Sequence, residues 1–207
     1  MIKIKVCGMR EPDNIRNLIQ LSPDFIGFIF YPESKRYVGE DFPVTAINSV
    51  PSGIKKVGVF VNELLEHVVK KYNKYNLDYV QLHGKEQVEY CRELMTINIK
   101  VIKAFGIDGS FDMTQTEKYS DSCNYFLFDT KSAQYGGTGR KFNWNHLTRI
   151  PDNKPFFLSG GIGPEDIDEI KKLNIPELFA IDINSRFEQS PGLKDITMLQ
   201  KFITEFK

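Results

Sequence analysis

Short apolar runs alternate along the chain with segments that show helical periodicity or contain many turn residues. Several of the runs consist almost entirely of Ile, Val, Phe and Tyr, which is typical of parallel strands covered by helices. The predicted strands are Ile2–Val6, Phe25–Phe30, Lys56–Val61, Tyr79–His83, Lys100–Ala104, Tyr125–Phe128, Phe156–Leu158 and Phe179–Ile183.

Helices are predicted where apolar residues recur on one face. The three clearest are Glu63–Asn73 with Leu64, Leu65, Val68 and Val69, Glu86–Met95 with Val88, Cys91, Leu94 and Met95, and Lys194–Phe206 with Leu199, Phe202, Ile203 and Phe206. The segments that follow the second, fifth and sixth strands are weakly helical, so their helices are expected to be short or missing.

This alternation predicts an α/β protein. Eight strands in 207 residues leave about 26 residues (207/8) for each strand–helix unit, which is compact but sufficient for a (β/α)8 TIM barrel that forms a single domain over residues 1–207. A doubly wound open sheet fits the same alternation.

Two consecutive strand ends near the C-terminus favour the barrel. Phe156–Ile167 and Leu178–Glu188 each pass from an apolar strand to small or polar residues and then to helical sequence. Gly160 and Gly161 allow close approach of a ligand to the backbone, and Pro164 suits the first turn of a helix. Ser185 and Glu188 have the spacing of a capping box, which predicts a short helix. Such a pair of strand ends forms the phosphate site of many (β/α)8 barrels.

The amino-acid composition indicates which kinds of binding partner and which compartment to expect. Lys plus Arg and Asp plus Glu are both 27, which argues against a general nucleic-acid or anionic-membrane binder. The first ten residues lack the apolar core of a signal peptide, and no apolar run is long enough to cross a bilayer. Three widely spaced cysteines form no disulfide framework and no metal pair, which fits the reduced cytoplasm.

In a (β/α)8 barrel, function belongs at the carboxyl ends of the strands. The polar residues expected there are Cys7, Arg36, Asn62, His83, Asp129, Gly160, Gly161, Asp182, Asn184 and Ser185. Their types and spacing do not suggest a metal site.

Cys7 and Asp129 are the candidates for proton transfer. A free cysteine is usually a small buried hydrophobe, but a thiolate at the catalytic face can remove a carbon-bound proton if its pKa is lowered. Asp129 can serve as a helix cap or pair with Lys131, or it can be a carboxylic acid kept partly protonated by an apolar setting. One acid and one base at the mouth of a barrel suit an isomerase that needs no cofactor.

The remaining candidates concern the substrate. The fork of Arg36 matches a carboxylate, whereas His83 is weaker because a histidine at a strand end is often structural. The glycine-rich stretch Lys131–Asn143 is either a surface loop or a lid over the site. We assign Gly137 and Gly139 within it to substrate binding.

At these residues the chain resembles the phosphoribosylanthranilate isomerase family of tryptophan biosynthesis. The resemblance lies in KVCGMR, GFIFYPESKRYV, VGVFVN, VQLHG, FDTKSAQYGGTGRKFNW, LSGGIGPEDI and IDINSRFEQSPGLKD, which begin at residues 5, 27, 57, 80, 128, 158 and 181. It therefore covers the chain from the first strand to the last helix.

The resemblance implies an Amadori rearrangement of N-(5-phosphoribosyl)anthranilate to 1-(2-carboxyphenylamino)-1-deoxyribulose 5-phosphate, with no cofactor. It implies that Asp129 is the general acid and Cys7 the general base. It further implies that Arg36 holds the anthranilate carboxylate, that Asp182 positions the substrate, and that the backbone around Gly160, Gly161, Asn184 and Ser185 holds the phosphate.

Arg186 and Phe187 depart from the family pattern, in which a small and then an aliphatic residue are expected after Ser185. We hypothesise that Arg186 adds a cation to the phosphate site. Two other functions remain open: a related phosphosugar isomerase of histidine biosynthesis, in which an aspartate is expected in place of Cys7, and a non-catalytic phosphosugar-binding barrel. The expected partner is a small phosphorylated molecule, without nucleic acid or membrane, and the chain is expected to be a monomer or a homodimer.

Overall fold

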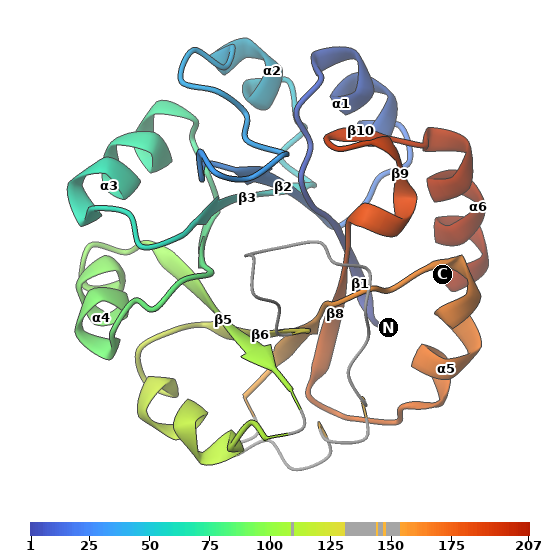
Figure 1. Cartoon of the computed structure of the whole chain (residues 1–207). Helices are drawn as coiled ribbons and strands as arrows, with labels where there is room; N and C mark the ends of the chain where they lie inside the picture. The colour runs from blue at the N-terminus through green and yellow to red at the C-terminus, as the bar shows by residue number, and fades with distance from the viewer. Residues whose placement is uncertain (109, 131–143, 145–146, 148–153) are drawn as a thin grey trace.

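The computed structural model describes residues 1–108, 110–130, 144, 147 and 154–207. Eight parallel strands follow one another around a closed barrel, and the first strand pairs with the last (Figure 1). The strands are β1 Lys3–Val6, β2 Phe25–Ile29, β3 Lys55–Phe60, β4 Tyr79–Leu82, β5 Lys100–Ile107, β6 Tyr125–Thr130, β7 Phe156–Leu158 and β8 Leu178–Ile183. The predicted TIM barrel is confirmed, and the doubly wound open sheet is wrong because β1 and β8 close the sheet.

The predicted strands agree with these to within a few residues. The largest difference is at β5, which continues to Ile107 rather than ending at Ala104. It does so because β5 and β6 remain paired residue by residue as far as Ile107 and Thr130, beyond the apolar run that marked the strand in the sequence.

Helices surround the barrel and cover its strands (Figure 1). They are α1 Pro12–Ile19, α2 Val44–Asn48, α3 Leu65–Lys74, α4 Val88–Thr96, α5 Ile167–Lys172 and α6 Ile196–Phe206, with 3-10 turns η1 Met113–Tyr119, η4 Pro164–Asp166 and η5 Ser185–Phe187. The helix after β2 has five residues and the segment after β5 forms a 3-10 turn, so the expectation of short helices there is confirmed. Among the described residues, no helix is long and apolar enough to span a membrane.

Each of the three predicted helices begins later than expected, because polar residues at their predicted starts have other partners. Glu86 is buried and accepts hydrogen bonds from the backbone of Asn62 and Gly84. Lys194 belongs to a short strand, and the Asp195 side chain caps α6 by accepting from the Met198 backbone. The apolar faces of α4 and α6 are confirmed, whereas Leu64 precedes α3 and is exposed.

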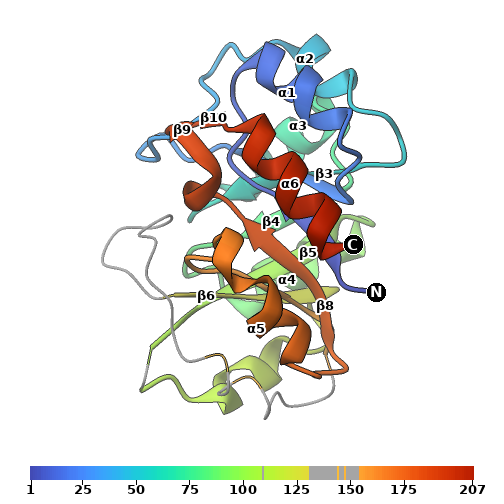
Figure 2. The ribbon, with the colours of Figure 1, turned by 90° about the vertical axis from the view of Figure 1, so that its right-hand side faces the viewer.

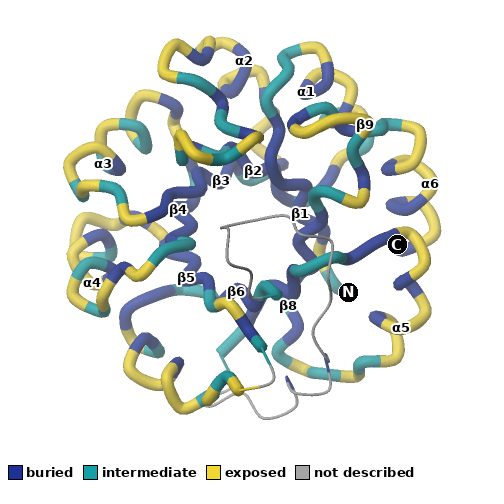
Figure 3. Tube along the Cα trace, viewed as in Figure 1, coloured by how far each residue is buried: buried dark blue, intermediate teal, exposed yellow. Residues whose placement is uncertain are grey.

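The core has two layers, which follow from the alternation of side chains along each strand. Outward residues such as Ile4, Val6 and Val80 pack against the helices. Inward residues such as Phe25, Tyr79 and Phe157 fill the amino-terminal part of the barrel with aromatic rings in edge-to-face contact. In Figure 3 the strands are buried and the exposed positions lie on the outer faces of the helices.

A small hairpin, β9 Glu188–Ser190 with β10 Leu193–Lys194, joins β8 to α6. Figure 2 shows this hairpin at the end of the barrel opposite the N-terminus, where the strands point. The predicted capping box of Ser185 and Glu188 is wrong. A single 3-10 turn does form at Ser185, but it has no side-chain cap, because Glu188 is bonded to Arg36 and Lys194.

Candidate active site

A pocket opens at the carboxyl ends of the strands. Side chains alternate between the inside and the outside of the barrel, and the inward-facing ones bring polar residues together there. It is lined by nine of the ten polar residues expected there, namely Cys7, Arg36, His83, Asp129, Gly160, Gly161, Asp182, Asn184 and Ser185. Gly137, Gly139 and the loop Lys131–Asn143 lie outside the described residues. Asn62 is not part of the lining. Its side chain accepts from the backbone of Lys85 and so ties the β3 end to the β4 end.

The floor of the pocket holds a buried polar cluster around Lys5. The Lys5 Nζ donates to Asp182 Oδ2 at 2.9 Å and to Gln81 Oε1 at 2.8 Å, and it also interacts with the thiol of Cys7. Gly27 of β2 makes room for that thiol, since a Cβ on Gly27 would stand 2.7 Å from the Cys7 sulfur. A cation therefore lies beside the candidate base.

Burial and mutual attraction set the protonation of this cluster. Burial alone would lower the pKa of Lys5, but the charges of Asp182 and Cys7 leave that pKa raised. Burial raises the pKa of Cys7, and Lys5 opposes this increase. Burial likewise raises the pKa of Asp182, again opposed by Lys5. Lys5 thus remains cationic, and it is the main group that favours a thiolate at Cys7, with a smaller contribution from Lys194.

The two carboxylate oxygens of Asp182 differ in their hydrogen bonding. Its Oδ2 accepts from Lys5, whereas the buried Oδ1 has no hydrogen-bond partner among the residues that the structure describes. A buried carboxylate oxygen without a donor is costly. Because Asp182 lines the pocket, this oxygen can accept a hydrogen bond from a hydroxyl group of a bound molecule.

Asp129 lies at the end of β6 with two polar neighbours. Its Oδ1 accepts from the Thr130 backbone at 2.8 Å, and its Oδ2 lies 3.3 Å from Nε2 of His83. The apolar setting predicted for Asp129 is therefore wrong, because the strand alternation places His83 of the β4 end against it. The predicted alternative of a pair with Lys131 concerns a residue outside the described ones.

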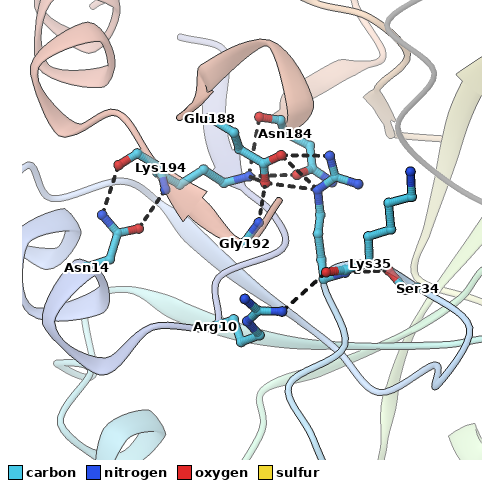
Figure 4. Close-up of polar contacts among 9 residues, drawn as sticks. Arg10, Asn14, Ser34, Lys35, Asn184, Glu188, Gly192 and Lys194 are labelled. Atoms are coloured by element: carbon cyan, nitrogen blue, oxygen red, sulfur yellow. Dashed lines mark hydrogen bonds and ion pairs between the residues drawn. The ribbon is translucent and has the colours of Figure 1, made fainter. Parts of the chain in front are cut away.

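Arg36 is held by an internal carboxylate. Its Nε donates to Oε1 and Oε2 of Glu188 at 2.9 and 3.0 Å, and its Nη2 donates to Oε2 at 2.6 Å. Glu188 also accepts from Lys194 Nζ at 2.7 Å, and Lys194 donates to Asn184 Oδ1 at 2.6 Å (Figure 4). Burial alone would raise the pKa of Glu188, but the bonds from Arg36 and Lys194 hold it below its usual value.

This arrangement leaves one edge of the guanidinium for a ligand. Glu188 occupies the edge formed by Nε and Nη2, whereas Nη1 has no hydrogen bond to any residue that the structure describes. A guanidinium can bind one carboxylate on each edge, because its five N–H groups form a planar fork. Arg36 lines the pocket, so it can present its Nη1 edge to an anionic group there.

The burial of Lys194 leads to a testable prediction about how stability depends on pH. Burial lowers its pKa to about 8, from a usual value of 10.5. Between these two values the unfolded chain holds a proton that the folded chain has lost, so raising the pH favours folding. The free energy of unfolding of the wild-type protein is compared with that of Lys194→Met at each pH. This difference should shift in favour of the wild-type protein by about 2 kcal/mol when the pH is raised from 7.5 to 9.5. Urea unfolding of both proteins at the two pH values measures this difference, and an unchanged or reversed difference would contradict it.

The residues predicted to hold a phosphate lie at the ends of β7 and β8. Gly160 and Gly161 have φ of +95° and +72°, which side chains rarely adopt. A Cβ on Gly160 would also stand 2.6 Å from the Thr130 backbone nitrogen. Arg186 does not line the pocket, and its Nη2 forms an exposed ion pair with Glu165 at 2.5 Å. The structure therefore gives no support to the hypothesis that Arg186 adds its charge to the phosphate site.

Sequence reasoning missed the roles of four polar residues that support the site: the buried Lys5, Gln81 and Lys194 and the partly buried Glu188. A signal existed for the first two, since each stands two residues before a predicted site residue on the same strand and hence on the same face. For Glu188 and Lys194 the sequence held no such signal. Glu188 pairs with Arg36, which is 152 residues away, and Lys194 Nζ bonds Glu188 and Asn184 in the fold. Among the described residues, no group of three or more His, Cys, Asp or Glu could hold a metal ion.

Comparisons with known proteins point to one family. Residues 4–205 match the family described as N-(5'-phosphoribosyl)anthranilate (PRA) isomerase. The N-(5'-phosphoribosyl)anthranilate isomerase of Parabacteroides distasonis is 48% identical over 204 residues, which cover 98% of this chain and 92% of that protein.

Solved structures show the same similarity. Phosphoribosyl anthranilate isomerase from Thermotoga maritima superposes with a TM-score of 0.86 at 33% identity, covering 100% of this chain and 98% of that one. A phosphoribosyl anthranilate isomerase in complex with reduced 1-(o-carboxyphenylamino)-1-deoxyribulose 5-phosphate superposes with a TM-score of 0.84 at 31% identity, again over 100% and 98% of the two chains.

Proposed function

This chain belongs to the N-(5'-phosphoribosyl)anthranilate isomerase family, and from that membership we propose how its residues carry out the reaction. It is an isomerase of tryptophan biosynthesis. The reaction converts N-(5-phosphoribosyl)anthranilate, an aminoaldose, to 1-(2-carboxyphenylamino)-1-deoxyribulose 5-phosphate, an aminoketose. The observation that carries the residue assignments is the convergence of Cys7, Asp129, Arg36 and Asp182 on one pocket.

Asp129 begins the reaction as general acid. Its carboxyl group gives a proton to the ring oxygen of the sugar, the bond from that oxygen to C1 breaks, and the anthranilate nitrogen supplies the electron pair of a protonated Schiff base. General acid catalysis of this kind typically contributes 10²–10⁴-fold. Asp129 is suited to the task because it lines the pocket, while its Oδ1 is held by the Thr130 backbone and its Oδ2 lies beside His83.

Cys7 then acts as general base. Its thiolate takes the proton from C2, and the electrons of that C–H bond form the C1–C2 double bond of an enolamine while the Schiff base is neutralised. The enolamine becomes the ketone when C1 gains a proton and the C2 hydroxyl loses one, so the whole reaction has no net proton demand. Lys5 stabilises the thiolate, in opposition to the burial that raises the pKa of Cys7.

The remaining residues place the substrate. The backbone around Gly160, Gly161, Asn184 and Ser185 holds the phosphate. The Oδ1 of Asp182, which has no hydrogen-bond partner among the described residues, accepts a hydrogen bond from a sugar hydroxyl. Arg36 binds the anthranilate carboxylate through its Nη1 edge, while Glu188 holds the other edge. His83 remains next to Asp129.

Arg36→Lys tests the carboxylate assignment. Lysine keeps the charge but not the fork, so KM should rise roughly tenfold while kcat changes little, since charged hydrogen bonds are worth about 1.5–3 kcal/mol. Steady-state kinetics with phosphoribosylanthranilate measures both constants. Arg10→Lys is the matched control, because Arg10 lies outside the pocket lining and bonds Glu11 and the Lys35 carbonyl. An unchanged KM in Arg36→Lys would reject the assignment.

The two other functions considered from the sequence are disfavoured. A histidine-pathway sister enzyme is expected to carry an aspartate where Cys7 stands, and a non-catalytic binding module would lack Cys7 or Asp129. We also propose that residues 1–207 act as one domain in the cytoplasm, as a monomer or a homodimer. Three free and buried cysteines are compatible with that reducing compartment.

A further inference from the structure

A line of hydrogen-bonding groups runs from Lys5 to Asp129, and its members Gln81, His83 and Asp129 line the pocket. Lys5 Nζ lies 2.8 Å from Gln81 Oε1, Gln81 Nε2 lies 2.9 Å from His83 Nδ1, and His83 Nε2 lies 3.3 Å from Asp129 Oδ2. We propose that Gln81 is a positioning residue that fixes the proton of His83 on Nε2, so that His83 can only donate toward Asp129. This inference rests on the role of Asp129 given under Proposed function.

The orientation of the Gln81 amide follows from the chemistry of its neighbour. A protonated lysine has three donors and no acceptor. Lys5 is buried, and its contact with Asp182 keeps it in place. The atom of Gln81 that faces Lys5 must therefore be the carbonyl oxygen, and the opposite atom must be the amide nitrogen.

The same logic continues to the imidazole. The amide nitrogen of Gln81 is only a donor, so Nδ1 of His83, which faces it, must be an acceptor and carries no proton. A neutral imidazole then has its proton on Nε2. Because Gln81 is buried and held at both ends, the neighbours of His83 specify a single tautomer.

This tautomer has a consequence for the acid. With a proton already on Nε2, His83 cannot accept the proton of Asp129, and its other nitrogen is blocked by the amide of Gln81. In the proposed reaction a proton given up by Asp129 therefore goes to the sugar ring oxygen and not to His83. When the O–H bond of Asp129 breaks and the new O–H bond forms on the substrate, the N–H of His83 and the backbone N–H of Thr130 both face the resulting carboxylate.

Nuclear magnetic resonance tests the tautomer without reference to activity. The full-length protein is prepared with ¹⁵N-labelled histidine, and the ring signals of His83 among the three histidines are assigned by their loss in His83→Gln. The expected spectrum has a protonated Nε2 and an unprotonated Nδ1. A proton on Nδ1 in the wild-type protein would overturn the proposal, whether or not the enzyme is active.

Two substitutions at position 81 test the positioning role. Gln81→Glu places an acceptor opposite Nδ1, so a proton should appear on Nδ1 and kcat should fall by about tenfold or more, with KM nearly unchanged. Gln81→Met removes the amide, so both tautomers should be populated, with a smaller fall in kcat. The matched control is Gln87→Glu, because Gln87 is exposed and bonds the Lys85 carbonyl outside the pocket lining.

The outcomes separate this proposal from the assignment of the acid. An unchanged Nδ1 signal in Gln81→Glu, or wild-type kcat in both position-81 variants despite changed tautomers, would reject the role of Gln81. If Asp129→Asn kept full activity instead, the acid would be another residue, and the spectrum of His83 would still show whether Gln81 fixes the tautomer.

Discussion

Replacing Asp129 with Asn should lower kcat for phosphoribosylanthranilate by at least about a hundredfold. Asparagine has nearly the same shape and can still accept from the Thr130 backbone, as Asp129 does at 2.8 Å. It has no acidic proton, so the sugar ring oxygen would leave without protonation. The fold should be retained, because the side chain lies at the pocket rather than in the apolar core.

Steady-state kinetics with the loss of substrate fluorescence measures this effect. Asp168→Asn is the matched control, because Asp168 is exposed in the first turn of α5 and lies outside the pocket lining. The control should retain wild-type kcat. If Asp129→Asn also retained it, the ring would have to be opened by another acid.

The second large effect is expected for Cys7→Ser, in which kcat should also fall by about a hundredfold or more. A hydroxyl group is a much weaker acid than a thiol, so serine would supply almost no anion to remove the C2 proton, even beside Lys5. Binding should change little, because the phosphate and carboxylate contacts belong to other residues.

A second thiol provides the comparison for Cys7→Ser. Cys91 is buried in α4, where burial raises its pKa to about 11, and Cys91→Ala should leave kcat unchanged. Substrate labelled with deuterium at C2 gives an independent measurement. The wild-type enzyme should show a slower turnover with this substrate if proton removal by Cys7 limits the rate, and a Cys7→Ser enzyme with wild-type kcat would exclude Cys7 as the base.

The positions of the site residues were predictable because strands alternate with period two and function lies at their carboxyl ends. Cys7, His83 and Asp129 each lie at the end of a predicted strand, and all three line one pocket. The glycines after β7 were predictable for another reason, since few residues tolerate the positive φ found at Gly160 and Gly161.

The partners of these residues were not predictable, because they depend on which distant segments meet. Lys5 shares its face of the strand with Cys7, but only barrel closure buries it against Asp182, which is 177 residues away. Glu188 has the spacing of a helix cap, yet its bonds to Arg36 and Lys194 take precedence. Buried charges are stable only with such partners, so tertiary pairing outweighs the local motif.

The central claim is that the protein isomerises phosphoribosylanthranilate with Cys7 and Asp129 as base and acid. It is tested most directly by measuring turnover of substrate that is formed in the assay mixture. Phosphoribosylanthranilate is formed from anthranilate and phosphoribosyl pyrophosphate, and its fluorescence is followed after addition of wild-type protein, Cys7→Ser or Asp129→Asn. We expect rapid loss of fluorescence with the wild-type protein and a rate at least about a hundredfold lower with each variant. Wild-type rates in either folded variant would contradict the acid–base pair, and no loss with the folded wild-type protein would contradict the activity itself.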